Sequence, residues 1–231
     1  MKIERQSFSN RAVHWLTASS IFWLIVTGIA QMPVAKRYYL TEVPGLRFMG
    51  EYYTTLTQHY IAAAILVAVG FYHIAYHFAR KEFDIIPKRG DFSASVAVIK
   101  AMIKGEPEPP SEKYLPEQRL AYAFIALVIL LMIVTGVMKS WKNLTGNDLS
   151  DFWIYWAAML HNLGMVLIIL GIIGHLAAFI MKPNRKLIEG MVHGGVDAHY
   201  VLERHGRWEE GVKRATKALK REEIERDSAD S

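Results

Sequence analysis

The stretch from Phe152 to Met181, FWIYWAAMLHNLGMVLIILGIIGHLAAFIM, contains no Asp, Glu, Lys or Arg. Three further stretches share this lack of charge: Ala12–Ala35, Tyr52–Ala79 and Leu120–Met138. A helix rises about 1.5 Å per residue, so about 20 apolar residues cross the hydrocarbon core of a bilayer. Helices on the surface of soluble proteins carry charge on their outer face, which these stretches lack. We therefore predict an all-α integral membrane four-helix bundle, with helices at about residues 12–32, 52–79, 118–139 and 152–181.

The distribution of Lys and Arg predicts the orientation of this bundle. The N-terminal segment, the connection from Arg80 to Arg119 and the tail after Met181 hold 3, 8 and 11 of the 27 basic residues. Cytoplasmic loops are enriched in Lys and Arg, so both termini are predicted to be cytoplasmic. Residues 1–182 are expected to form the membrane domain and residues 183–231 a cytoplasmic helical tail. The net charge of +5 then follows from this bias and does not indicate nucleic-acid binding.

The connection between the second and third spans is long enough to hold structure of its own. Phe92–Ile103, FSASVAVIKAMI, is predicted to form a short interfacial helix, and the proline-rich segment Glu106–Pro110 is predicted to be extended. The chain contains no Cys. This excludes disulfides, Cys-ligated iron–sulfur clusters and the covalent attachment of c-type haem. Any redox group must therefore be held by His or Met, or bound non-covalently.

Six of the nine histidines lie in or at the edges of the predicted spans: His14, His59, His73, His77, His161 and His175. Ionisable groups are costly inside a membrane, so each is a candidate functional residue. The alternative for any one of them is a neutral imidazole bonded to a neighbouring helix. The pair His161 and His175 is more informative, because 14 residues at about 100° each return to nearly the same helix face. The rise between them, roughly 21 Å, suits two flat cofactors stacked across a bilayer.

Each of these two histidines would need a partner ring at matching depth on another helix. His59 lies level with His161 near the outer end of its span. For His175, both His14 and His73 qualify by depth, and the 14-residue spacing from His59 slightly favours His73. Small residues near these positions suit either a porphyrin or ordinary helix packing: Gly28, Gly70, Gly136, Gly164, Gly171 and Gly174. A faint repeat, Ile-Val-Thr-Gly at residues 25–28 and 133–136, is too short to indicate duplication.

Several segments together resemble the cytochrome b556 (gamma) subunit of membrane-bound formate dehydrogenases, a di-haem cytochrome b family. They are Ser9-Asn-Arg11-Ala-Val-His14-Trp, Thr57-Gln-His59, Met159-Leu-His161-Asn with His175, Ile188-Glu-Gly190 and Arg204-His-Gly-Arg207-Trp208. The resemblance covers nearly the whole chain. It implies two haem b groups, the outer one bound by His59 and His161 and the inner one by His14 and His175. His73 and His77 would then not be ligands.

The resemblance also implies a quinone pocket beside the inner haem. In the family this pocket uses the inner ligand, here His175, and an Asn just before the third helix. Leu115 stands where the family often has that Asn, so Glu117 or Gln118 is expected to take its place. Tyr114 and His73 complete the candidate contacts.

By the same resemblance, an iron–sulfur (beta) subunit on the periplasmic side and a molybdenum or tungsten catalytic (alpha) subunit are the expected partners. Electrons would reach menaquinone or ubiquinone in the bacterial cytoplasmic (inner) membrane, within a higher oligomer of the complex. The chain itself contains no catalytic site for the primary substrate. The alternatives are a cytochrome b subunit of a hydrogenase or sulfur-compound reductase, and a haem-free proton-coupled transporter.

Overall fold

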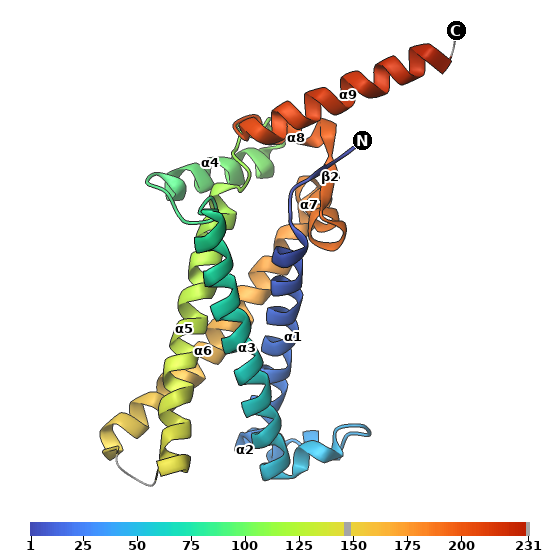
Figure 1. Cartoon of the computed structure of the whole chain (residues 1–231). Coiled ribbons are helices and arrows are strands. Elements are labelled where there is room, and N and C mark those ends of the chain that lie inside the picture. The colour runs from blue at the N-terminus through green and yellow to red at the C-terminus, as the bar shows by residue number, and fades with distance from the viewer. Residues whose placement is uncertain (146–148, 230–231) are drawn as a thin grey trace. The chain divides into compact units, whose positions relative to one another are not determined.

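The computed structural model describes residues 1–145 and 149–229 of the chain. Four long helices dominate it (Figure 1): α1 (Phe8–Gln31), α3 (Tyr52–Arg80), α5 (Pro116–Thr145) and α6 (Asp151–Ala177). All four are long and apolar enough to cross a membrane. Large side chains on them remain exposed, such as Phe22 at 65% and Leu127 at 67%, as expected for surfaces that contact lipid. The prediction of an all-α membrane bundle is confirmed.

Most of these helices extend beyond the predicted limits by up to about two turns. The predictions followed the loss of charge, whereas a helix continues as long as its backbone hydrogen bonds do. Thus α1 includes Ser9, Asn10 and Arg11, and α5 begins at Pro116, a residue whose fixed φ suits the first position of a helix. At its C-terminal end, α6 is followed directly by the 3-10 turn η3 (Ala178–Ile180).

The chain divides into two compact units, one of which is Ser9–Lys81. Besides α1 and α3, this unit contains α2 (Pro33–Arg37) and two short 3-10 turns, η1 (Leu40–Glu42) and η2 (Arg47–Gly50). Helix α3 ends at Lys81, whose left-handed backbone (φ 55°) lets its N–H bond the carbonyls of His77 and Phe78. This is an αL termination of the kind that satisfies the last carbonyls of a helix.

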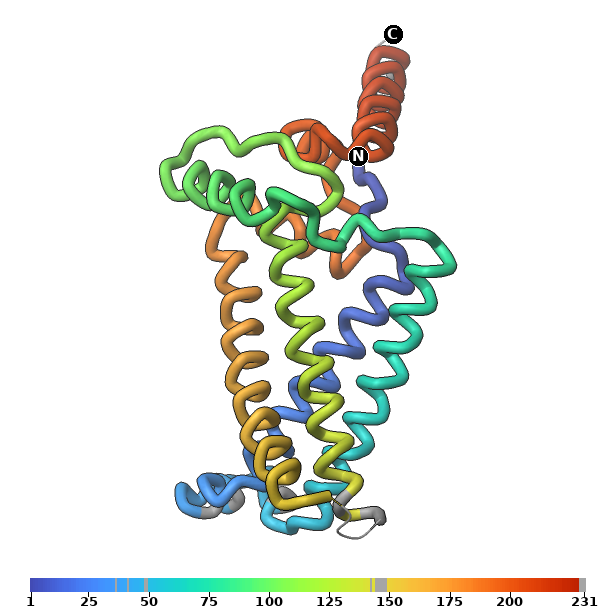
Figure 2. Tube along the Cα trace, turned by 90° about the vertical axis from the view of Figure 1, so that its left-hand side faces the viewer, coloured from blue at the N-terminus to red at the C-terminus, as the bar shows by residue number. Residues whose placement is uncertain are grey.

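The other unit comprises Met1–Phe8 and Glu82–Ser231. Within it, α5 and α6 pack along one another (Figures 1 and 2). Helix α4 (Asp91–Lys104) packs on the first turns of α5 and matches the short helix predicted at Phe92–Ile103. An ion pair joins the two helices, because Arg119 Nε lies 2.8 Å from Asp91 Oδ2 and Arg119 Nη2 lies 2.5 Å from Asp91 Oδ1. The neighbouring guanidinium lowers the pKa of the Asp91 carboxyl.

The N-terminus and the tail form a small folded cap in this unit. Strand β1 (Lys2–Glu4) pairs antiparallel with β2 (Gly195–Asp197), and neither strand was predicted. Helices α7 (Lys182–His193), α8 (Ala198–Arg204) and α9 (Glu209–Ala229) complete the tail. A buried cluster connects these elements with the end of the second connection: Ile3, Leu115, Leu187, Val196, Ala198, Tyr200, Val201 and Ala215.

Two polar residues of the tail lie inside this cap. Arg204 donates to Glu108 Oε2 at 2.8 Å and to Asn184 Oδ1 at 2.7 Å. His205 is fully buried, and its Nδ1–H donates to the carbonyl of Glu112 at 2.7 Å. Burial, assisted by the charge of Arg5, lowers the pKa of His205 to about 4, so the ring is neutral at pH 7.

The cap bears on topology, because it joins three segments that are separated by membrane spans. The N-terminal strand pairs with the tail, and Arg5 Nε donates to the carbonyl of Lys113 in the second connection at 3.2 Å. Segments in direct contact outside the spans lie on one side of the membrane. They are the same three segments that carry most of the Lys and Arg, which is the arrangement expected for the cytoplasmic side.

Candidate functional site

Helix α6 carries two of the candidate ligands without interruption between them. It is α-helical from Asp151 to Ala177, so His161 and His175 lie on nearly the same face, four turns apart. The ring of His175 also contacts Phe179 edge-on, with ring centroids 5.7 Å apart. The geometry predicted from their spacing is therefore present in the helix.

His59 on α3 is oriented by a side chain of α1 in its own unit. Thr27 is fully buried, and its Oγ1 lies 2.8 Å from Nδ1 of His59. The same hydroxyl donates to the carbonyl of Trp23, one turn earlier, at 2.8 Å. Gly28 follows directly, and a Cβ there would lie 3.7 Å from Cε1 of the His59 ring. The imidazole thus packs against a Thr-Gly pair.

His161 on α6 has the same surroundings in the other unit. Thr135 of α5 is 2% exposed, and its Oγ1 lies 2.9 Å from Nδ1 of His161. This hydroxyl donates to the carbonyl of Leu131 at 2.7 Å. A Cβ at Gly136 would lie 3.3 Å from Cε1 of the ring, which is a tight contact. Neither threonine was predicted as a site residue, although both belong to the Ile-Val-Thr-Gly repeat.

The other candidate histidines lie near the opposite ends of α1 and α3. His14 belongs to the second turn of α1 and contacts Trp15 edge-on, with ring centroids 5.1 Å apart. His73 and His77 lie one turn apart near the end of α3, and their rings are 4.4 Å apart. The choice between His14 and His73 as the partner of His175 stays a prediction.

The glycines that suggested a porphyrin fall into three groups. Gly28 and Gly136 face the histidine rings described above. Gly164 and Gly171 face side chains of α5, because a Cβ at these positions would lie 2.4 Å from Met132 Sδ and 3.1 Å from Phe124 Cε1. These two glycines serve helix packing. Gly70 and Gly174 have open space in front of them, so a flat group can approach the backbone there.

The candidate quinone contacts before α5 have different surroundings. Leu115 is 1% exposed and belongs to the core of the cap. The Tyr114 hydroxyl donates to Gln6 Oε1 at 3.3 Å. The Gln118 side-chain oxygen accepts from Arg5 Nη2 at 3.1 Å and from the backbone N–H of Leu115 at 3.2 Å.

Glu117 differs from these neighbours. Both of its carboxylate oxygens are buried and make no hydrogen bond with any described residue. A buried carboxylate without a hydrogen-bond donor is unfavourable, and it calls for an explanation by function or by a bound group. Among the four residues of this segment, Glu117 is the one whose side-chain oxygens are buried without a hydrogen bond to a described residue.

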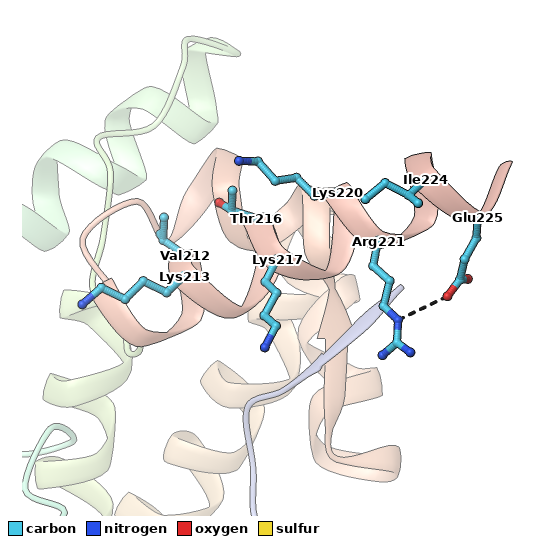
Figure 3. Close-up of a pocket in the computed structure, with 8 residues that line it drawn as sticks. All are labelled: Val212, Lys213, Thr216, Lys217, Lys220, Arg221, Ile224 and Glu225. Atoms are coloured by element: carbon cyan, nitrogen blue, oxygen red, sulfur yellow. Dashed lines mark ion pairs between the residues drawn. The ribbon is translucent and has the colours of Figure 1, made fainter. Parts of the chain in front are cut away.

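A hollow also runs along the tail helix α9, between side chains such as Val212, Thr216 and Ile224 (Figure 3). Lys213, Lys217 and Lys220 extend away from the helix, and Arg221 pairs with Glu225 at 3.2 Å. This is the open face of a solvated helix with alternating charge, as the sequence predicts, and it contains none of the candidate residues.

The histidines suit haem iron better than a bare metal ion. Among residues 1–145 and 149–229, no group of three or more His, Cys, Asp or Glu side chains could hold a metal ion. A haem iron is already bound by the porphyrin and needs only axial ligands, which histidines commonly provide. Two oriented imidazoles and open backbone at Gly70 and Gly174 meet these requirements.

Comparison with known protein families agrees with this chemistry. A family model described as prokaryotic cytochrome b561 matches residues 5–194, which include all four membrane-spanning helices. No curated protein sequence matches the chain significantly. The matched range ends at the start of β2, so α8 and α9 lie outside it.

Proposed function

Because the chain belongs to the prokaryotic cytochrome b561 family, we propose that it is the di-haem b subunit through which a membrane-bound formate dehydrogenase delivers electrons to quinone. Family membership itself makes the chain a haem b electron-transfer protein, and its four apolar helices make it a multi-pass bacterial membrane protein. A haem-free transporter is therefore disfavoured. The number of haems, the quinone and the catalytic partner belong to the proposal.

The observation that carries the two-haem proposal is the placement of His161 and His175 on one face of α6, four turns apart. One haem cannot take both rings at a separation of roughly 21 Å, so each ring serves a different site. We assign His59 as the partner of His161, and His14 as the partner of His175. Each haem iron would supply one-electron oxidation and reduction when bound, and its two imidazoles would hold it and influence its potential.

We assign the quinone contacts to His175 and Glu117. The side-chain oxygen of Gln118 already accepts hydrogen bonds from Arg5 and from the Leu115 backbone, and Leu115 is packed in the cap. Glu117 therefore replaces the family's Asn best. Reduction of a quinone takes up protons as well as electrons, and a carboxylic acid can donate a proton where an amide cannot. The family's Asn could only donate a hydrogen bond at this position.

The tail supports the choice of formate dehydrogenase as the catalytic partner. The segment Arg204–Trp208 lies beyond the family match and belongs to the tail, which resembles the formate dehydrogenase group more closely than the hydrogenase group. In the structure, Arg204 and His205 are buried in the cap. Because they are buried, these two side chains are not themselves a contact for a partner subunit. They would instead stabilise the fold of the cap, whose surface is proposed to face the cytoplasm.

The experiment is a reduction assay on membranes that contain the native complex. Formate, hydrogen and a reducible or oxidisable sulfur compound are added separately, and the b-type absorption bands are recorded. Reduction of these bands by formate alone, with a molybdenum or tungsten subunit copurifying, supports the proposal. Reduction by hydrogen alone would assign the chain to a hydrogenase.

The ligand assignment has its own test in the same preparation. The variant His161→Ala is expected to contain one haem b per chain in place of two, because each ring serves one iron. His193→Ala, at an exposed tail histidine, is the matched control and should keep both. Retention of two haems in His161→Ala would show that this residue is not a ligand.

A further inference from the structure

The two Ile-Val-Thr-Gly segments occupy equivalent places in the two units. Thr27 and Thr135 lie in the second half of a membrane-spanning helix, and each hydroxyl reaches the next membrane-spanning helix along the chain. The contacted atom is Nδ1 of a histidine in both cases, at 2.8 and 2.9 Å. The glycine that follows each threonine faces Cε1 of the same ring. The shared motif thus corresponds to a shared contact.

The direction of each hydrogen bond depends on the single hydrogen of the threonine hydroxyl. A carbonyl one turn earlier lies within reach of each hydroxyl, that of Trp23 for Thr27 and that of Leu131 for Thr135. When the hydroxyl donates to this carbonyl, its oxygen accepts from the imidazole. The histidine then carries its hydrogen on Nδ1, and the lone pair that a metal requires is on Nε2.

We propose that Thr27 and Thr135 are positioning residues that fix His59 and His161 in the Nδ1–H tautomer, with Nε2 available for the outer haem iron. This inference rests on the proposed assignment of these two histidines as ligands. A ligating histidine that donates its other N–H to an acceptor is a better electron donor to the metal. Both axial ligands of one haem would then be strengthened by the same device, one from each half of the chain.

The glycines complete the arrangement by giving each ring room to meet its threonine. A side chain at position 136 would press on the His161 ring, because its Cβ would already lie 3.3 Å from Cε1. At position 28 the corresponding distance is 3.7 Å, which leaves ordinary contact. A substitution at Gly136 is therefore expected to disturb its histidine ring more than one at Gly28.

A structural alternative explains the same contacts. Buried hydroxyls in membrane helices often bond the carbonyl one turn earlier, and a buried imidazole needs a partner in any case. Under this alternative the threonines stabilise the helices and have no effect on a bound haem. The two readings differ in the redox potential of the haem, which helix packing alone does not set.

The test uses Thr27→Val and Thr135→Val, which keep the shape of the side chain and remove the acceptor, in the purified complex. Redox titration of the b-type bands and the low-spin EPR signal of each haem are recorded. We expect a shift of the outer haem to a more positive midpoint potential in each variant, because a weaker ligand stabilises ferric iron less. The shift should be larger in the double variant and absent for the inner haem.

Three further variants distinguish positioning of the histidine rings from general loosening of the helices. Thr27→Ser and Thr135→Ser retain the hydroxyl and should restore the native potential. Thr55→Val removes a hydroxyl that is 1% exposed and donates to the carbonyl of Tyr52 at 2.9 Å, so it is the matched control and should shift neither haem.

Unchanged potentials and EPR signals in both valine variants, together with loss of one haem in His161→Ala, would overturn this inference and leave the proposed function standing. Equal shifts of both haems, or a shift in Thr55→Val, would also overturn it. Two retained haems in His161→Ala would instead remove the ligand assignment on which the inference depends.

Discussion

The variant Asp91→Ala tests how the connection between the second and third membrane helices is held on the third one. Asp91 receives two hydrogen bonds from the Arg119 guanidinium, and the two side chains are 5% and 6% exposed. The carboxylate also accepts from the backbone N–H of Lys88 at 2.7 Å. Removing the carboxylate leaves a buried guanidinium that keeps only the Tyr114 carbonyl, at 2.9 Å, and a longer contact with Glu112.

The expected cost follows from this geometry. Breaking a buried ion pair by removing one partner destabilises a protein by about 3–5 kcal/mol. Arg119 keeps a weaker contact with Glu112, at 3.4 Å, and that carboxylate is 36% exposed. We therefore expect a value at the lower end, about 3 kcal/mol. The effect should appear as local unfolding of α4 and the following extended segment.

Limited proteolysis of the complex in detergent measures this unfolding through cleavage between residues 82 and 115. At about 3 kcal/mol, the open state should rise by roughly two orders of magnitude, and the cleavage rate should rise with it. The exposed pair Arg214–Glu210 provides the control, because Glu210→Ala should change the rate less than twofold.

The double variant Asp91→Leu/Arg119→Met shows whether the unpaired charge is the cause. Replacing a buried pair by apolar residues of similar size is often neutral, so the double variant should be cleaved nearly as slowly as the native chain. Native-like cleavage of the single variant would refute the reasoning. Cleavage of the double variant as rapid as that of the single variant would assign the cost to lost packing instead.

Three other predictions concern the haem, the cap and the quinone. His14→Ala should remove the inner haem and His73→Ala should retain it, as counted from the b-type bands; the reverse result would exchange the two residues. The pKa of His205 is lowered to about 4 from about 6.5 in an unfolded chain, so the neutral ring stabilises the cap fully above pH 6.5, and up to about 3 kcal/mol of this stabilisation is lost as the pH falls towards 4. Proteolysis of the tail should therefore accelerate at acidic pH, and it should accelerate less in His205→Gln. The variant His199→Gln, at an exposed position, should behave like the native chain. Glu117→Gln should slow quinone reduction about 100-fold while the haems are still reduced by the primary donor, whereas Glu189→Gln, in the exposed pair with Lys2, should have no effect; an unchanged rate in Glu117→Gln would exclude its role in proton transfer.

The membrane fold could be predicted because its signal is contiguous in sequence. A span such as Phe152–Met181 needs only length and absence of charge, and both are visible without neighbours. The same holds for the spacing of His161 and His175 on one helix. The cap could not be predicted in this way. Its strands are three residues each, and their pairing joins positions near both ends of the chain.

The residues around the candidate ligands show a different limit. The Ile-Val-Thr-Gly repeat was visible, but four residues carry little statistical weight, and a threonine gives no indication of which ring it will meet. That information depends on how α1 packs on α3 and how α5 packs on α6. Likewise, Glu117 and Gln118 were both candidates to take the place of the family's Asn, and the sequence does not indicate that the Gln118 oxygen bonds Arg5.

The two histidine–threonine contacts also bear on how a cofactor would be received. Each contact joins neighbours inside a single unit, so the orientation of the His59 ring does not depend on α6 and that of His161 does not depend on α3. Ordering a side chain on binding costs roughly 0.5–1.5 kcal/mol. Rings that are already ordered avoid this cost, and they present the correct nitrogen before the iron arrives. Under the proposed ligand assignment, each unit of the chain therefore orients one axial ligand through contacts of its own.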